Sequence, residues 1–131
     1  MGLSQRVRAA RRVYLIGNGG SYANAVHICN DLVACGIRAH VLDPATLTAN
    51  ANDYGYETIF ERWVSVMGEP GDLLIALSGS GRSANILRAV ERARSLGMDV
   101  HLETNFLRDL DMQASEEAQL VMGHELMRSL R

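Results

Sequence analysis

The sequence contains no lysine, because all 13 of its basic residues are arginines. This absence excludes a lysine Schiff base and a lysine-held pyridoxal phosphate. It also excludes a P-loop, whose lysine reaches the terminal phosphates of a nucleotide. Any phosphate that this protein binds must therefore be held by arginine, by hydroxyl groups or by backbone N–H groups.

The chain also lacks an excess of charge and any long apolar run. Its 131 residues carry a formal net charge of −2, which provides no electrostatic footprint for nucleic acid. No apolar run approaches the ~18 residues of a membrane span, and the first residues do not form the apolar core of a signal peptide. The only two cysteines, Cys29 and Cys35, suit a reducing compartment. We therefore expect a single cytoplasmic domain over 1–131 that binds neither nucleic acid nor membrane.

Short apolar runs alternate along the chain with longer stretches of helical periodicity. The pattern predicts strands over 13–16, 37–42, 72–77 and 98–102, and helices over 21–35, 57–67, 83–96 and 112–130. Residues 44–56 are expected to form a loop with about one helical turn. The alternation predicts a parallel sheet with helices on both faces and right-handed crossovers.

Two turns rich in glycine and serine each follow a predicted strand and open a predicted helix. They are Gly17-Asn-Gly-Gly-Ser21 and Ser78-Gly-Ser-Gly-Arg-Ser83. Ligands of α/β sheets bind at such turns, where helix N–H groups and serine hydroxyls favour a phosphate. One such turn could be an ordinary connection, but two in one small sheet favour a phosphate site. Since Tyr22 stands at the third glycine position of a dinucleotide fingerprint, we expect no nucleotide cofactor.

The first long helix carries a pair of polar side chains with the spacing of a site. His27 and Asp31 lie four residues apart, on one face of the helix. The opposite face is expected to be an apolar stripe of Tyr22, Ala25, Val26, Cys29, Leu32 and Val33. The polar pair suits two ligands of one metal or an acid/base pair, and it also fits an ordinary exposed ion pair.

The last helix carries a second candidate pair. Glu116 lies within a quarter-turn of His124, but Gln113 and Glu117 lie about as near to the same face. Spacing alone therefore does not choose among these three partners for His124.

Three blocks of sequence, taken together, carry a family resemblance. They are Gly17-Asn-Gly-Gly-Ser21 followed by His27, then Ala51-Asn-Asp-Tyr-Gly-Tyr56, then Gly71-Asp-Leu-Leu-Ile-Ala-Leu-Ser-Gly-Ser-Gly-Arg-Ser83. In this order they resemble the SIS (sugar isomerase) domain family and, within it, the phosphoheptose isomerases. The resemblance implies a flavodoxin-like three-layer α/β/α sandwich with a parallel sheet of four to five strands. The helical arm that usually precedes the first strand in the family is expected to be lacking.

The resemblance also implies roles for particular residues. The sugar phosphate would be held by Ser21, Ser78, Ser80 and Ser83, and the sugar site would be lined by Asn18, Gly19 and Asp53. A metal ion, expected to be Zn²⁺, would be bound by His27, Asp31, Glu116 and His124. Asp31 and His124 would also be the catalytic pair. The partners implied are a phosphorylated sugar and further copies of the chain, in a homodimer or homotetramer with shared sites.

The implied activity is the aldose–ketose interconversion of sedoheptulose 7-phosphate through an enediol. Three residues depart from the family: Asp31 replaces Glu, Glu116 replaces Gln, and Gly79 stands where Thr is usual. The substitutions at Asp31 and Glu116, together with the short connection over 103–111, favour an alternative. It is a non-catalytic SIS-domain protein that binds a sugar phosphate or a protein partner, as the DnaA initiator-associating type does. The retained histidines and carboxylates favour the enzyme, because a pure binding protein has no need of them.

Overall fold

The sheet of this protein contains four parallel strands in the order β2-β1-β3-β4, in a computed structural model that describes residues 1–104 and 111–131. The strands are β1 (Val13–Gly17), β2 (Ala39–Val41), β3 (Leu73–Leu77) and β4 (Asp99–Glu103). The central strands β1 and β3 are buried along their whole length, as expected of a parallel sheet covered on both faces. No described helix is long and apolar enough to cross a membrane.

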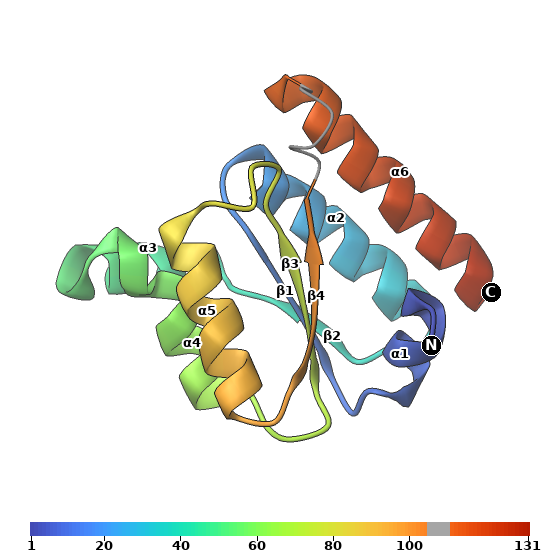
Figure 1. Cartoon of the computed structure of the whole chain (residues 1–131), viewed down its shortest axis with the longest axis horizontal. Helices are drawn as coiled ribbons and strands as arrows, with labels where there is room; N and C mark the ends of the chain where they lie inside the picture. The colour runs from blue at the N-terminus through green and yellow to red at the C-terminus, as the bar shows by residue number, and fades with distance from the viewer. Residues whose placement is uncertain (105–110) are drawn as a thin grey trace.

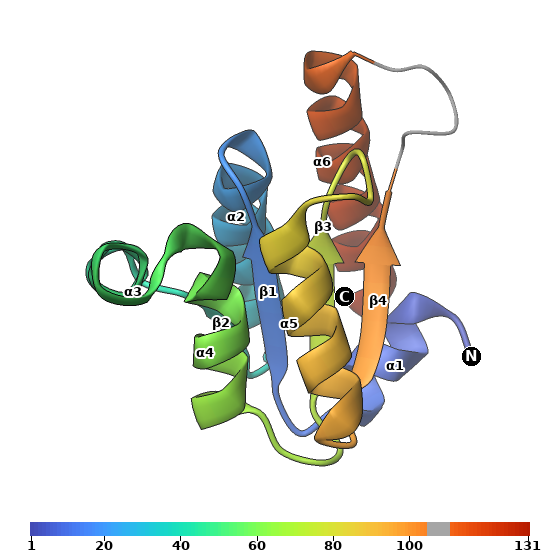
Figure 2. The same cartoon turned by 60° about the vertical axis from the view of Figure 1, so that its left-hand side comes forward.

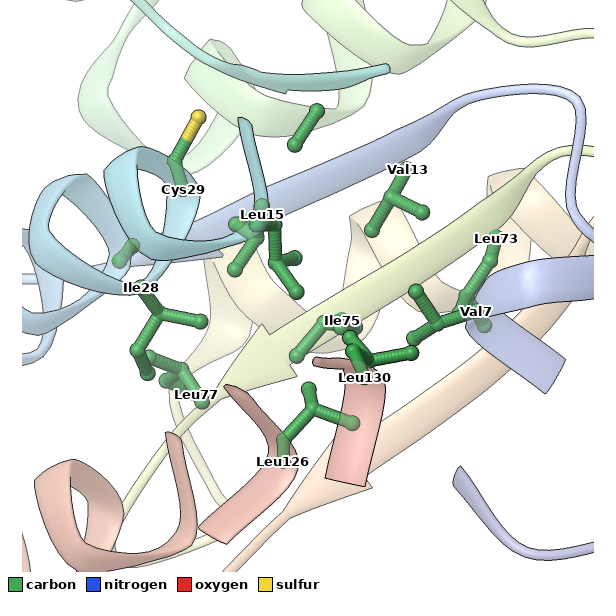
Figure 3. Packing of buried hydrophobic residues seen from close by; sticks show 13 residues of the cluster. Val7, Val13, Leu15, Ile28, Cys29, Leu73, Ile75, Leu77, Leu126 and Leu130 are labelled. Carbon is green, nitrogen blue, oxygen red and sulfur yellow. The ribbon is translucent and has the colours of Figure 1, made fainter. Parts of the chain in front are cut away.

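Helices cover both faces of this sheet (Figures 1 and 2). One face carries α1 (Leu3–Ala9), α2 (Gly20–Ala34) and α6 (Met112–Leu130); the other carries α4 (Ile59–Met67) and α5 (Ala84–Ser95). Side chains alternate along β1, so that Leu15 enters the core beneath α2 and α6 while Tyr14 enters the core beneath α4 and α5. Figure 3 shows the first of these cores, where Leu126 and Leu130 of α6 meet Ile75 of β3. The predicted three-layer α/β/α sandwich is confirmed.

The loop predicted over 44–56 is wrong. This segment forms α3 (Pro44–Tyr54), followed by the short 3₁₀ helix η1 (Tyr56–Thr58). The carboxylate of Asp43 accepts a hydrogen bond from Thr46 N at 3.0 Å, and Pro44 occupies the first turn, so the start signals were present in the sequence. Periodicity missed the helix because none of its residues is buried.

The apolar stripe predicted for α2 is also partly wrong. Val26 and Val33 are 42% and 55% exposed, whereas Ile28 and Asp31 are buried. The reason is that α6 packs along α2 and covers the face that carries Asp31. The face predicted to point away from the core is therefore covered in part by another helix of the same chain.

Candidate active site

The two glycine- and serine-rich turns lie side by side at the carboxyl edge of the sheet. Gly17 at the end of β1 is the register partner of Leu77 at the end of β3, so the turns that follow these strands are neighbours. Gly19 and Gly81 have φ angles of 54° and 68°, in the left-handed region that glycine adopts without strain. The pair of turns thus forms the kind of edge where α/β proteins bind anions.

Serine hydroxyls hold the second turn in shape. Ser78 Oγ accepts a hydrogen bond from Gly81 N at 3.1 Å and lies 3.4 Å from Ser83 Oγ, while Ser80 Oγ accepts from Arg82 N at 3.1 Å. Ser83 precedes α5 but makes no capping hydrogen bond with its side chain. The turn therefore gathers three hydroxyls at the N-terminus of a helix, where they can donate to a phosphate.

Asn18 in the first turn belongs to a polar network that was not predicted. Its side chain exchanges two hydrogen bonds of 2.9 Å with the buried amide of Asn85, and its Oδ1 also accepts from the hydroxyl of Tyr56 at 2.8 Å. Beside this network lies a hollow of about 360 Å³ lined in part by Asn18, Glu57 and Ser83. The hollow therefore has residues of both glycine- and serine-rich turns in its lining.

Asp53, which was predicted to line the sugar site, lies outside the hollow beside Asn18. It is exposed near the end of α3, and its carboxylate accepts a hydrogen bond from the Asn52 amide at 3.1 Å.

The start of α6 closes over both turns. Ser115 Oγ occupies the space that a side chain at Gly79 would need, and the carboxylate of Glu116 occupies the space that a side chain at Gly20 would need. Gln119, one turn further along, donates to Ser21 Oγ at 3.1 Å. Gly79 therefore has a steric reason to be glycine in this chain, since a hydroxyl from α6 already stands there.

Three of the four predicted metal ligands come together between α2 and α6. His27 Nε2 lies 3.2 Å from His124 Nε2 and 3.4 Å from Asp31 Oδ2. One ligand atom from each residue lies within 4.8 Å of the others. The His27 side chain is 49% exposed and that of Asp31 only 12%. The cluster is therefore exposed to solvent at His27 and buried at Asp31.

This cluster fits a metal ion on two counts. Tetrahedral Zn²⁺ with ligand bonds near 2.1 Å places neighbouring ligand atoms about 3.4 Å apart, close to the 3.2 and 3.4 Å observed. In addition, Asp31 Oδ2 is buried and has no hydrogen-bond partner among the described residues. Such an oxygen is costly unless a cation or a donor reaches it. The two imidazoles and one carboxylate are ligands that zinc commonly takes.

The carboxylate of Glu116, the fourth predicted ligand, reaches from α6 to Gly20 at the start of α2 and lies outside this cluster. The alternatives that spacing left open, Gln113 and Glu117, are exposed.

The fold and site define a doubly wound α/β domain with a serine-rich turn at the carboxyl edge of its sheet and a histidine–carboxylate cluster between two helices. The chain belongs to the SIS domain family, whose model matches residues 3–101, and this confirms the resemblance seen in the sequence. It is similar to the phosphoheptose isomerase of Rhodospirillum rubrum, with 45% identity over 102 residues that cover 72% of this chain and 54% of the relative. That of Crocosphaera subtropica is 42% identical over 104 residues, covering 73% and 53%.

Solved structures agree with these relatives. Phosphoheptose isomerase GmhA from Neisseria gonorrhoeae superposes with a TM-score of 0.88 and 26% identity, over 98% of this chain and 80% of the other. A phosphoheptose isomerase from Francisella tularensis gives 0.85 and 28%, over 97% and 81%. The chain spans about half the length of the curated relatives it matches.

Proposed function

We propose that this chain is a sugar-phosphate isomerase of the phosphoheptose type, which interconverts sedoheptulose 7-phosphate and the corresponding aldose phosphate. The observation that carries the proposal is the cluster of His27, Asp31 and His124. It gathers acid–base groups around a buried carboxylate oxygen, an arrangement that phosphate binding alone does not require. The relatives named phosphoheptose isomerase support the same activity.

Aldose–ketose isomerisation moves a proton between adjacent carbons through an enediol. It requires a base for the carbon-bound proton, an acid for the oxygens and a stabilised oxyanion. Asp31 removes the proton from one carbon and returns it to the next, and His124 transfers the proton between the two oxygens. Zn²⁺ held by His27, Asp31 and His124 would supply polarisation of the substrate carbonyl, and Glu116, the predicted fourth ligand, lies outside this cluster.

The hydroxyls of Ser21, Ser78, Ser80 and Ser83 bind the phosphate, together with N–H groups at the start of α5. The phosphate does not react, so its binding energy serves to fix the sugar in the reactive orientation. Asn18 and Gly19 are proposed to face the sugar, whereas Asp53 stays a prediction because it does not line the hollow beside Asn18. The network of Asn85 and Tyr56 holds the Asn18 amide in one orientation.

We further propose that a second copy of the chain covers the solvent-exposed side of the cluster at His27, in a homodimer or homotetramer. Half-exposed His27 lies on α2, which also carries the exposed apolar side chains of Val26 and Val33. Sedimentation equilibrium of the wild type and of Val33→Arg tests this step. A wild type that is monomeric at assay concentration but fully active contradicts it.

Replacement of His124 tests the activity itself. His124→Ala should abolish turnover of sedoheptulose 7-phosphate while the protein still binds the sugar phosphate, because the phosphate turn is separate from the cluster. Glu125→Ala, at an exposed neighbouring position on the same helix, is the matched control and should retain activity. Full activity of His124→Ala would refute the assignment.

A second candidate function is the non-catalytic SIS-domain protein. The position of Glu116 favours it, because the fourth predicted ligand lies outside the cluster. Metal analysis and calorimetry on the wild type separate the two functions. Sugar-phosphate binding with no bound metal and no turnover supports the second, and turnover that is lost on chelation supports the isomerase.

A further inference from the structure

Gln119 is a polar side chain that the proposed mechanism does not use, yet it is completely buried at 0% exposure. It lies on α6 and contacts the first two turns of α2. Its Oε1 accepts from Asn24 Nδ2 at 3.0 Å, and its Nε2 donates to Ser21 Oγ at 3.1 Å. Both ends of the amide are therefore satisfied by side chains of the other helix.

The direction of these hydrogen bonds is set by the backbone. The Glu116 carbonyl oxygen can only accept, and it accepts from Asn24 Nδ2 at 2.8 Å. The end of Asn24 that faces α6 must therefore be its NH₂ group. The same group contacts Gln119, so Gln119 presents its oxygen to Asn24 and its NH₂ group to Ser21. The Ser21 hydroxyl consequently has to accept from Gln119.

A hydroxyl that accepts one hydrogen bond still has its own proton to donate. Among the described residues the structure gives Ser21 Oγ no acceptor for that proton. Ser21 is in the first turn of α2, at the carboxyl edge of the sheet, where α/β proteins bind anions. We propose that Gln119 is a positioning residue, which fixes the Ser21 hydroxyl as a donor to the bound phosphate. This inference rests on the proposed function, because it needs a phosphate at this edge of the sheet.

Gln119→Glu reverses the proposed polarity with almost no change of shape. One oxygen of the new carboxylate still accepts from Asn24, and the other accepts the Ser21 proton and withdraws it from the ligand. We expect the affinity for inorganic phosphate and for sedoheptulose 7-phosphate, measured by calorimetry, to fall about 10- to 100-fold, as for one lost hydrogen bond to a charged group. Gln113→Glu adds the same charge to an exposed position on the same helix and should leave both affinities within about twofold of wild type.

A cycle with Ser21→Ala separates positioning from simple charge repulsion. If Gln119 acts through Ser21, Gln119→Glu should have less than about a twofold effect in the Ser21→Ala background. The difference between Gln119→Glu and wild type should also shrink as the pH falls, because the introduced carboxyl group, once protonated, can again donate to Ser21. An equal loss in both backgrounds, with no such pH dependence, would overturn the proposal.

Gln119→Met provides an uncharged variant of similar volume if the buried carboxylate prevents folding. It removes the donor to Ser21, and its effect on phosphate affinity should again vanish in the Ser21→Ala background. Wild-type affinity in Gln119→Met overturns the positioning role. The wild-type titration itself tests the proposed function: absence of sugar-phosphate binding there refutes the function, whereas binding that Gln119 does not affect refutes the positioning role alone.

Discussion

The contact between Gly123 of α6 and Ile28 of α2 sets the spacing of the helices that carry the cluster. Gly123 directly precedes His124, and Ile28 directly follows His27. A Cβ added at Gly123 would lie 2.5 Å from Ile28 Cγ1 and 2.8 Å from Cδ1. Carbon atoms in contact are normally about 3.5 Å apart or more, so Gly123→Ala requires a displacement of about 1 Å.

The expected effect on catalysis is larger than the effect on stability. Alanine favours the helix by about 1 kcal/mol over glycine, and overpacking costs about 1–3 kcal/mol, so the free energy of unfolding should fall by no more than about 2 kcal/mol. A shift of about 1 Å between the helices, however, would change the 3.2 Å separation of His27 and His124. Misplacement on this scale can lower turnover about 10²-fold.

The assay is turnover of sedoheptulose 7-phosphate with metal content and urea denaturation measured on the same samples. Ile28→Ala removes both clashing atoms and leaves Cβ at 3.7 Å, so Gly123→Ala/Ile28→Ala should recover part of the lost activity. Ile28→Ala alone should cost about 2–5 kcal/mol of stability, less in the double variant. Gly2→Ala, where a Cβ meets nothing within 4 Å, is the control. Wild-type turnover and metal content in Gly123→Ala would show that this contact does not set the geometry of the site.

Two further predictions concern titratable groups outside the site. The hydrogen bond from Arg6 lowers the pKa of Asp99, so the pair stabilises the protein at neutral pH and this contribution is lost as the pH falls through the folded-state pKa. Because the Asp99 side chain is 51% exposed, Asp99→Asn should lower the free energy of unfolding by less than about 1 kcal/mol at pH 7. The difference between variant and wild type should be smaller in acid, and a difference that grows in acid contradicts the pairing. Burial raises the pKa of the Cys29 thiol, so alkylation in the native protein should be slower at Cys29 than at partly exposed Cys35. The two cysteines should react at similar rates in denaturant. Equal rates of alkylation in the native protein would contradict the burial of Cys29.

The sequence predicted correctly those strands and helices that appear in it as a run or a periodic pattern of apolar residues. The run at 72–77 is buried on both faces of the sheet, and its confirmed counterpart β3 (Leu73–Leu77) reads as continuous apolar residues. By contrast, α3 has no buried residue, and a helix without a buried face leaves no periodicity to detect. Its signals were the capping carboxylate of Asp43 and the proline that follows, which also fit the end of a strand.

Residues that act through tertiary contacts were harder to find. Asn85 and Gln119 are buried amides on helices, and in the sequence each looks like a polar residue of a solvated face. Their partners, Asn18 for Asn85 and Ser21 for Gln119, lie 67 and 98 positions away. No local pattern records such pairs. In the sequence, the only sign of these hydrogen bonds is that Asn85 and Gln119 are polar residues at helix positions that face the interior.

The relation between α2 and α6 explains why helical spacing could not place Glu116. The two helices run side by side in the same direction (Figure 1), because Gly20 meets Glu116, Asn24 meets Gln119 and His27 meets His124 in turn. Glu116 and His124 share a face, but eight residues at about 1.5 Å each separate them by about 12 Å along the helix. In this register Glu116 lies level with Gly20 at the start of α2, and His124 lies level with the cluster. A carboxylate at the N-terminus of α2 is favoured by the helix dipole, so the negative charge of Glu116 occupies a position that would suit the phosphate of a ligand. The glutamine that the resemblance implies at this position would carry no such charge, so Glu116 bears on the proposed phosphate binding rather than on the cluster.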